Sequence, residues 1–72
     1  MNREKIESKI KELNSMRAFQ QKHLREIKEK HQNKEISDIK FDKHKDKIDS
    51  KIDKIKHQIR ELEEEAEHLK HE

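Results

Sequence analysis

KIDSKIDKIKHQIRELEEEAEHLK, residues 47–70, places isoleucine and leucine at intervals that alternate between three and four residues. A repeat of this kind, sustained over about four heptads, is typical of a helix that packs along another helix. The series extends back to Phe41, and only Lys45 interrupts it. We therefore expect one long helix over about residues 38–71, with its apolar side buried against a helical neighbour.

The composition of the chain favours helices throughout. The 72 residues include no Gly, Pro, Cys, Trp or Tyr, and half of them are charged. Chains without glycine and proline lack the usual turn and helix-breaking residues, and most strand-forming residue types are missing as well. The absence of cysteine excludes disulfides, thiolate catalysis and zinc sites that use cysteine ligands. These features predict an all-α protein of one domain, residues 1–72.

The first half of the chain carries a weaker copy of the same repeat. It predicts a helix over about residues 2–32, in which Arg17 and Gln20 replace apolar residues in the middle of the repeat. Polar residues at such positions often set the register or the oligomeric state of a coiled coil, and they could instead meet carboxylates of a partner. The apolar positions of the two repeats together form the predicted hairpin seam: Ile6, Ile10, Leu13, Leu24, Ile27, Ile48, Ile52, Ile55, Ile59, Leu62 and Leu69.

A turn is expected at about residues 33–38, between the two repeats. Asn33 can adopt a left-handed backbone at a helix end, and Ser37 or Asp38 can cap the helix that follows. The prediction is an antiparallel two-helix coiled-coil hairpin, with one continuous helix as the alternative. In the expected register the numbers of facing residues sum to 72, so that Leu13 faces Ile59 and His31 faces Phe41.

Some apolar residues remain outside this seam. Because a two-helix unit cannot bury them all, we expect the hairpin to associate with itself as a helical bundle, with a dimer favoured. The candidate oligomer or partner surface comprises Met16, Phe19, Ile36 and Ile39 together with the polar seam residues Arg17 and Gln20.

The charges are sorted along the chain. Residues 1–34 contain ten Lys and Arg and five Glu, a net charge of +5, whereas residues 35–72 have a net charge of −3. This difference favours pairing of the two helices. A candidate anion-binding stripe, hereafter the lysine stripe, comprises Lys40, Lys43, Lys47, Lys51 and Lys54. It could track the phosphates of a nucleic acid, or it could be a solvated face that keeps a bundle soluble.

Histidine is the remaining residue type with metal-binding chemistry. The chain has six histidines, and His68 and His71 lie three residues apart on the predicted second helix, close to Glu64, Glu67 and Glu72. Two imidazoles and a carboxylate at this spacing can hold zinc or nickel, although surface histidines on a charged helix are the simpler interpretation. No metal site, cofactor or catalytic residue is assigned.

These observations favour a non-enzymatic function. No run of apolar residues is longer than two, so neither a signal peptide nor a membrane span is expected, and a cytoplasmic location follows. We predict a small protein–protein interaction module, an adaptor, inhibitor or scaffold part, that acts through coiled-coil surfaces on a protein partner still to be identified. Nucleic-acid association through the lysine stripe is the first alternative, and metal binding by histidines is the second.

Overall fold

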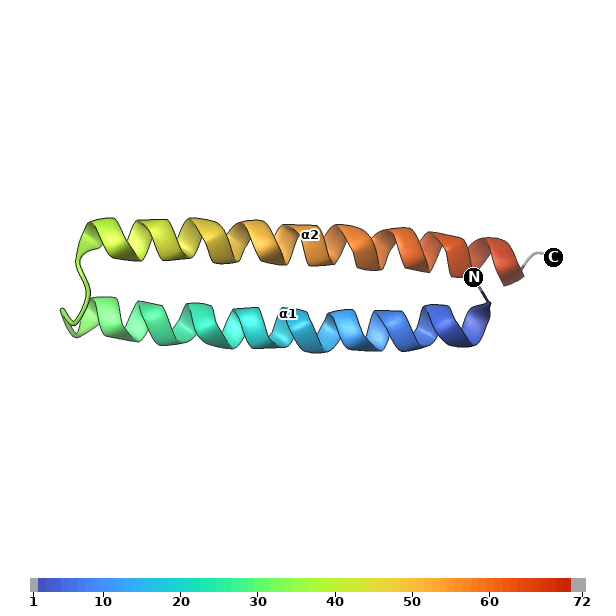
Figure 1. The fold of residues 1–72 in the computed structure, drawn as a ribbon, viewed down its shortest axis with the longest axis horizontal. Coiled ribbons are helices and arrows are strands. Elements are labelled where there is room, and N and C mark those ends of the chain that lie inside the picture. The colour runs from blue at the N-terminus through green and yellow to red at the C-terminus, as the bar shows by residue number, and fades with distance from the viewer. Residues whose placement is uncertain (1, 71–72) are drawn as a thin grey trace.

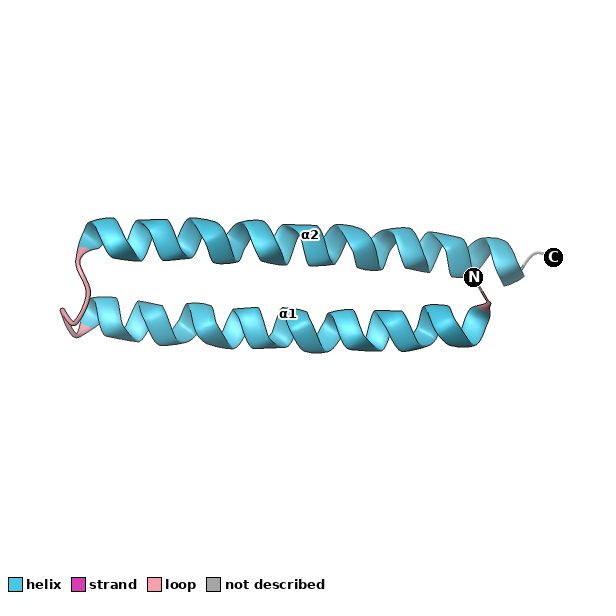
Figure 2. Cartoon of the chain, viewed as in Figure 1, coloured by secondary structure: helices cyan, strands magenta, loops and turns pink. Residues whose placement is uncertain are grey.

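The chain folds into two long antiparallel helices joined by a short turn. The computed structural model describes residues 2–70, in which α1 spans Arg3–Gln32 and α2 spans Asp38–Lys70. The helices lie side by side along their whole length, and the start of α1 and the end of α2 lie at the same end of the rod (Figure 1). The rod measures 55 × 15 × 13 Å. Between the helices only the turn has a loop conformation (Figure 2), so the predicted all-α helical hairpin is confirmed.

At each helix N-terminus a polar side chain accepts a hydrogen bond from one backbone amide. The side-chain oxygen of Asn2 accepts a hydrogen bond of 2.9 Å from the backbone N–H of Lys5, at the start of α1. The Oγ of Ser37 accepts one of 3.2 Å from the N–H of Lys40 at the start of α2. Of the two residues expected to cap α2, Ser37 therefore has this role, while Asp38 is the first residue of the helix. Such caps satisfy N–H groups that have no partner inside the helix.

The C-terminus of α1 is closed by a left-handed residue, but that residue is not the one expected. Asn33 has a right-handed φ of −83°, and Lys34 has a φ of +59°. The N–H of Lys34 donates to the carbonyl of His31, and the N–H of Glu35 donates to the carbonyl of Lys30. These two bonds make a Schellman motif, which needs its left-handed residue one position after the helix cap. The expectation for Asn33 was therefore wrong by one residue.

Replacing Lys34 with Gly is expected to raise the free energy of unfolding by about 0.5–1 kcal/mol. In the left-handed backbone region the Cβ atom of lysine has an unfavourable steric contact, and glycine has no Cβ. Urea denaturation followed by circular dichroism measures the change. Asn33→Gly is the matched control: its φ is already negative, so glycine should destabilise the hairpin there. Equal destabilisation by both changes would contradict the left-handed conformation of Lys34.

The interior consists of isoleucine and leucine from both helices. The buried side chains among residues 2–69 are Ile6, Leu13, Ile27, Ile48, Ile52, Ile55 and Ile59. All seven belong to the seam predicted from the sequence, and the other four seam residues, Ile10, Leu24, Leu62 and Leu69, are half-buried. Two helices packed against each other fully bury only one row of side chains. The residues on either side of that row stay half-buried unless a third helix covers them.

The core is divided into two clusters. The terminal cluster, near the open end of the rod, is built on Leu13, Ile55 and Ile59, with Ile10 and Leu62 packed against it. The turn cluster is built on Ile27, Ile48 and Ile52, with Leu24, Ile36 and Phe41 packed against it. Leu13 thus joins Ile59 as the register predicts. At the turn, the rings of His31 and Phe41 stack with their centroids 4.1 Å apart, which is another contact of that register.

Candidate interaction surface

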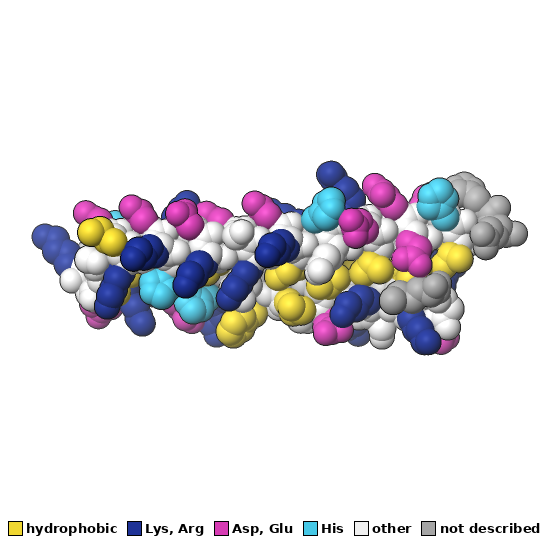
Figure 3. Space-filling view, turned by 45° about the horizontal axis from the view of Figure 1, so that its top comes forward, with side chains coloured by type: hydrophobic (Ala, Val, Ile, Leu, Met, Phe, Trp, Pro, Cys, Tyr) yellow, Lys and Arg dark blue, Asp and Glu magenta, His cyan; other side chains and the backbone are white. Residues whose placement is uncertain are grey.

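One side of the rod carries two adjoining grooves between the helices. Met16, Gln20 and the α2 residues Lys51, Lys54, Ile55 and Gln58 line the first groove. The second groove continues toward the open end and is lined by Lys9, Leu13, Gln58, Glu61, Leu62 and Glu65. Gln58 belongs to both, so the two grooves form one surface, which we call the groove face. Hydrophobic side chains reach the surface between the two helices, with charged side chains on both sides (Figure 3).

Met16 and Phe19 are the large exposed apolar residues of α1. Met16 is 47 % exposed and lines the first groove, and Phe19 is 64 % exposed. Residues three apart on a helix are neighbours on its surface, so Phe19 continues the apolar area that Met16 begins. Large exposed apolar side chains next to a groove between two helices indicate a surface suited to a further helix.

The polar seam residues lie at the boundary between the two clusters. Arg17 and Gln20 are both half-buried, and Gln20 lines the first groove beside Met16. At this level of the rod α2 contributes Ile52 to the turn cluster and Ile55 to the terminal cluster. In the α1 repeat the corresponding positions hold no apolar residue. The interruption seen in the sequence of α1 therefore corresponds to a real break in the core.

Ile36 and Ile39 do not join Met16 and Phe19. Ile36 is half-buried against the turn cluster and so belongs to the hairpin core. Ile39 is 69 % exposed in the first turn of α2. Thirteen residues of α1 separate Phe19 from the turn, a distance of about 20 Å along a helix. Of the apolar residues expected at an interaction surface, the structure brings together only Met16 and Phe19.

The lysine stripe runs along α2 at the turn half of the rod. Its five lysines are exposed, and none forms an ion pair within the described part of the chain. A row of Lys and Arg side chains on α2 lies parallel to a row of acidic side chains (Figure 3). Lys51 and Lys54 also line the groove face, so the stripe borders the apolar area.

Lys45, the one lysine at a seam position of α2, is held by a carboxylate of the next turn. Its Nζ lies 3.1 Å from Oδ2 of Asp49, and both side chains are partly exposed. The hydrogen bond and the charge of Asp49 raise the pKa of the Lys45 ammonium above its ordinary value of 10.5. Lys45 therefore keeps its charge at the edge of the seam, where the heptad repeat otherwise requires an apolar residue.

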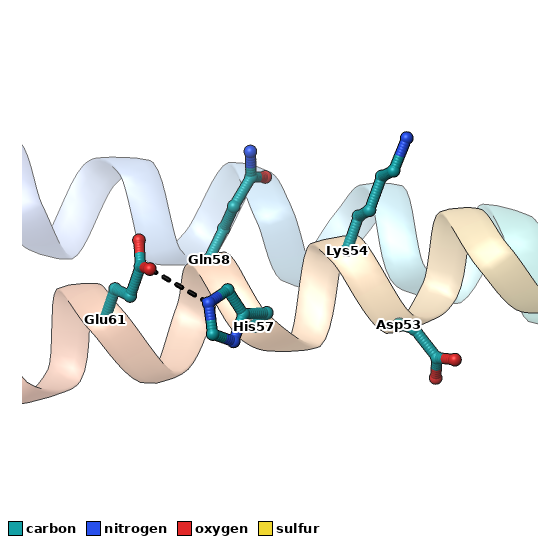
Figure 4. A pocket seen from close by; sticks show the side chains of 5 residues that line it. All are labelled: Asp53, Lys54, His57, Gln58 and Glu61. Atoms are coloured by element: carbon teal, nitrogen blue, oxygen red, sulfur yellow. Dashed lines mark ion pairs between the residues drawn. The ribbon is translucent and has the colours of Figure 1, made fainter.

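A further depression lies on α2 alone, between Asp53 and Glu61 (Figure 4). Nε2 of His57 is 3.0 Å from Oε1 of Glu61, and this pair lies along the surface of the helix. Asp53 points away from Lys54 and Gln58, so the side chains diverge rather than converge on one point (Figure 4). General acid–base catalysis requires groups that converge on a substrate atom, and this arrangement does not supply them.

The histidines are spread over both helices. Among residues 2–70, no group of three His, Cys, Asp or Glu side chains is placed to hold a metal ion. His68 is exposed near the end of α2, while His71 and Glu72, the other members of the expected cluster, lie outside the described residues. His31 has a structural role instead: its Nε2 is 2.6 Å from Oδ1 of Asp38, and its ring stacks on Phe41.

Gln58 was not singled out from the sequence, although it occupies the middle of the groove face. Its position seven residues after Lys51 places both on the same flank of the α2 repeat, so assigning heptad positions to the sequence would have identified it.

Neither α1 nor α2, over the residues described, has an apolar stretch of the length that a membrane crossing requires. Comparison with protein-family models, curated proteins and solved structures found no match.

Proposed function

We propose that the hairpin is a small, non-enzymatic protein–protein interaction module of the cytoplasm, which binds a helical partner along its groove face. The observation that carries the proposal is the exposure of Met16, which lines the first groove, and of Phe19, which lies three residues further along α1. A partner helix laid along the groove would cover these side chains together with the half-buried Leu62, in the way amphipathic helices bind apolar grooves.

The size of the face supports this proposal. A rod with extents of 55 and 15 Å has a face of about 800 Å², which is the area that a standard protein–protein interface takes from each partner. The face has an apolar middle and charged margins, and interfaces are commonly organised with an apolar centre inside a polar rim. Self-association and binding of a foreign protein would both use this surface.

Replacing Met16 and Phe19 with Gln is expected to weaken association through the groove face at least thirtyfold. Removing two partly exposed apolar side chains forfeits about 2–3 kcal/mol, and each 1.4 kcal/mol is a factor of ten. Sedimentation over a dilution series measures self-association. Quantitative capture from a host extract measures binding of other proteins, with the change between variants as the readout.

Ile39→Gln is the matched control, because it removes an exposed apolar side chain away from the groove face. It should leave association unchanged. Circular dichroism must show that both variants keep the helicity of the wild type. The proposal fails if the double Gln variant associates as strongly as the Ile39 variant.

Nucleic-acid binding through the lysine stripe is a second candidate, favoured by five exposed lysines along one helix that form no ion pair with any residue the structure describes. Phosphate contacts by lysine make binding strongly dependent on salt. A gel-shift series with duplex and single-stranded DNA and RNA at 50 mM salt and above tests it. A complex that weakens steeply with salt supports this candidate, and no shift at 50 mM salt removes it.

A further inference from the structure

We propose that the groove face binds an acidic amphipathic helix of another protein, whose carboxylates meet Lys51 and Lys54 while its apolar side chains cover Met16. The inference rests on the proposed function, since it names the chemistry of the partner for the same surface. It is carried by the residues that line the two grooves, because their charges differ.

The first groove combines apolar residues with positive charge. Met16 of α1 is exposed in its lining, and Ile55, which also lines it, belongs to the buried core of the hairpin. Lys51 and Lys54 line the α2 side and are exposed, and among the described residues no carboxylate shares this lining. A lysine has an aliphatic stem and a charged tip, so the two stems can extend the apolar area while the ammonium groups stay at its rim.

The second groove is lined by charges of both signs. Nζ of Lys9 lies 3.7 Å from Oε2 of Glu12, and Oε1 of Glu61 lies 3.0 Å from Nε2 of His57, so both lining residues already have a partner on their own helix. This groove therefore selects neither an acidic nor a basic helix strongly.

The charge of the first groove is not compensated in the same way. Lys51 and Lys54 form no ion pair with any residue that the structure describes. Asp53 precedes Lys54 in the sequence, but its side chain points away from that of Lys54 (Figure 4). The neighbouring residue of the lining toward the open end, Gln58, is neutral. Uncompensated positive charge therefore lies directly beside the apolar part of the first groove.

This charge decides which helices can cover the groove. A helix that covers Met16 also removes water from the ammonium groups beside it, which is unfavourable unless opposite charges meet them. Lys51 and Lys54 are three residues apart, a rise of about 4.5 Å along the helix. Glutamates three or four residues apart on a partner helix have a similar spacing, so two carboxylates can reach the two lysines. The groove thus accepts an acidic helix and disfavours a neutral or basic one.

A nucleic acid would use these lysines in a different way. Its phosphates would contact the ammonium groups alone, and the apolar area would contribute nothing to such contacts. An amphipathic helix uses both the charges and the apolar area. The presence of Met16, Lys51 and Lys54 in one lining favours the helix.

Synthetic helical peptides test the proposal. They share one apolar face of leucine and alanine, and the residues that flank this face are all glutamate, all glutamine or all lysine. The wild type is expected to bind the glutamate peptide at least tenfold more tightly than the lysine peptide, because attraction at two sites is replaced by repulsion. Fluorescence anisotropy of the labelled peptides measures the dissociation constants.

The variant K51E/K54E is expected to invert this preference, since carboxylates then line the first groove. The control K11E/K22E makes the same change of net charge at exposed lysines of α1 that line neither groove, and it should keep the preference of the wild type. Met16→Gln should weaken binding of the glutamate peptide at least threefold and leave the preference for it intact. Circular dichroism checks that each variant keeps the helicity of the wild type.

The acidic partner is overturned by equal affinity of the wild type for the glutamate and lysine peptides, or by an unchanged preference in K51E/K54E. Absence of binding to every peptide at about 100 μM overturns it as well. Binding of DNA or RNA that depends on Lys51 and Lys54 but not on Met16, without binding of the glutamate peptide, assigns these lysines to a nucleic acid instead.

Failure of the proposed function has a different signature. If the acidic partner is overturned while the Met16 and Phe19 Gln variant still loses self-association or capture of another protein, the interaction module stands with another occupant. If neither self-association nor capture depends on Met16 and Phe19, the proposed function fails too.

Discussion

Leu13→Ala is expected to lower the free energy of unfolding by about 2–4 kcal/mol, the cost of deleting most of a buried leucine side chain and leaving a cavity. Leu13 is 2 % exposed and is the residue of α1 on which the terminal cluster is built, against Ile55 and Ile59. A domain of this length has a total stability of about 4–10 kcal/mol. The variant should therefore lose a large share of its stability, and its helices should separate at a much lower urea concentration.

Leu69→Ala is the matched control, because it makes the same chemical change at a half-buried position near the end of α2. It should cost less than about 1 kcal/mol, since a partly exposed side chain loses little burial. Urea denaturation followed by far-ultraviolet circular dichroism measures both. Equal stabilities for the two variants would mean that Leu13 does not pack on Ile59, and the register of the hairpin would be wrong.

Replacing Arg17 and Gln20 with Leu is expected to raise the free energy of unfolding by about 2 kcal/mol and the melting temperature by roughly 8–15 °C. The two residues occupy the gap between the terminal and turn clusters, opposite Ile52 and Ile55. Leucine at both positions would join the clusters into one core. The gain is smaller than for fully buried side chains because both positions are half-buried.

The same change should reduce structural specificity. With an unbroken apolar seam, a shift of one helix by a heptad again pairs apolar with apolar residues, so the polar layer that marks the native register is lost. Sedimentation should then show a broader range of species than for the wild type. Lys22→Leu, at an exposed position of α1, is the control and should leave the melting temperature nearly unchanged. A double variant that melts below the wild type would show that Arg17 and Gln20 stabilise the hairpin themselves.

Much of the fold followed from periodicity alone. The spacing of Ile48, Ile52 and Ile55 predicted a buried face on α2, and the polar stretch around Ser37 predicted where the chain reverses. Both are local properties, because a repeat of three and four residues has one helical solution and a hydroxyl before an apolar repeat favours an N-cap. The left-handed residue of the turn was placed one position too early, since several residue types can end a helix and the hydrogen bonds that decide become visible only in three dimensions.

The candidate interaction surface could be predicted less well from the sequence. In the sequence, four apolar residues lie outside the seam, and the repeat does not distinguish Met16 and Phe19 from Ile36 and Ile39. Packing separates them: Ile36 closes the turn cluster, Ile39 lies apart on α2, and only Met16 lines a groove, with the exposed Phe19 three residues further along α1. Exposure depends on residues contributed by the other helix, and a linear pattern does not contain that information.

The amino-acid sequence by itself determined that this chain is helical, that it reverses once and that isoleucine and leucine join its halves, because propensity and periodicity act over a few residues. Only the tertiary structure decided that the core separates into two clusters, that Lys34 takes the left-handed position and that Gln58 lies between two joined grooves. These features depend on how side chains from distant parts of the chain fill a shared space, and that is settled only when α1 and α2 come into contact.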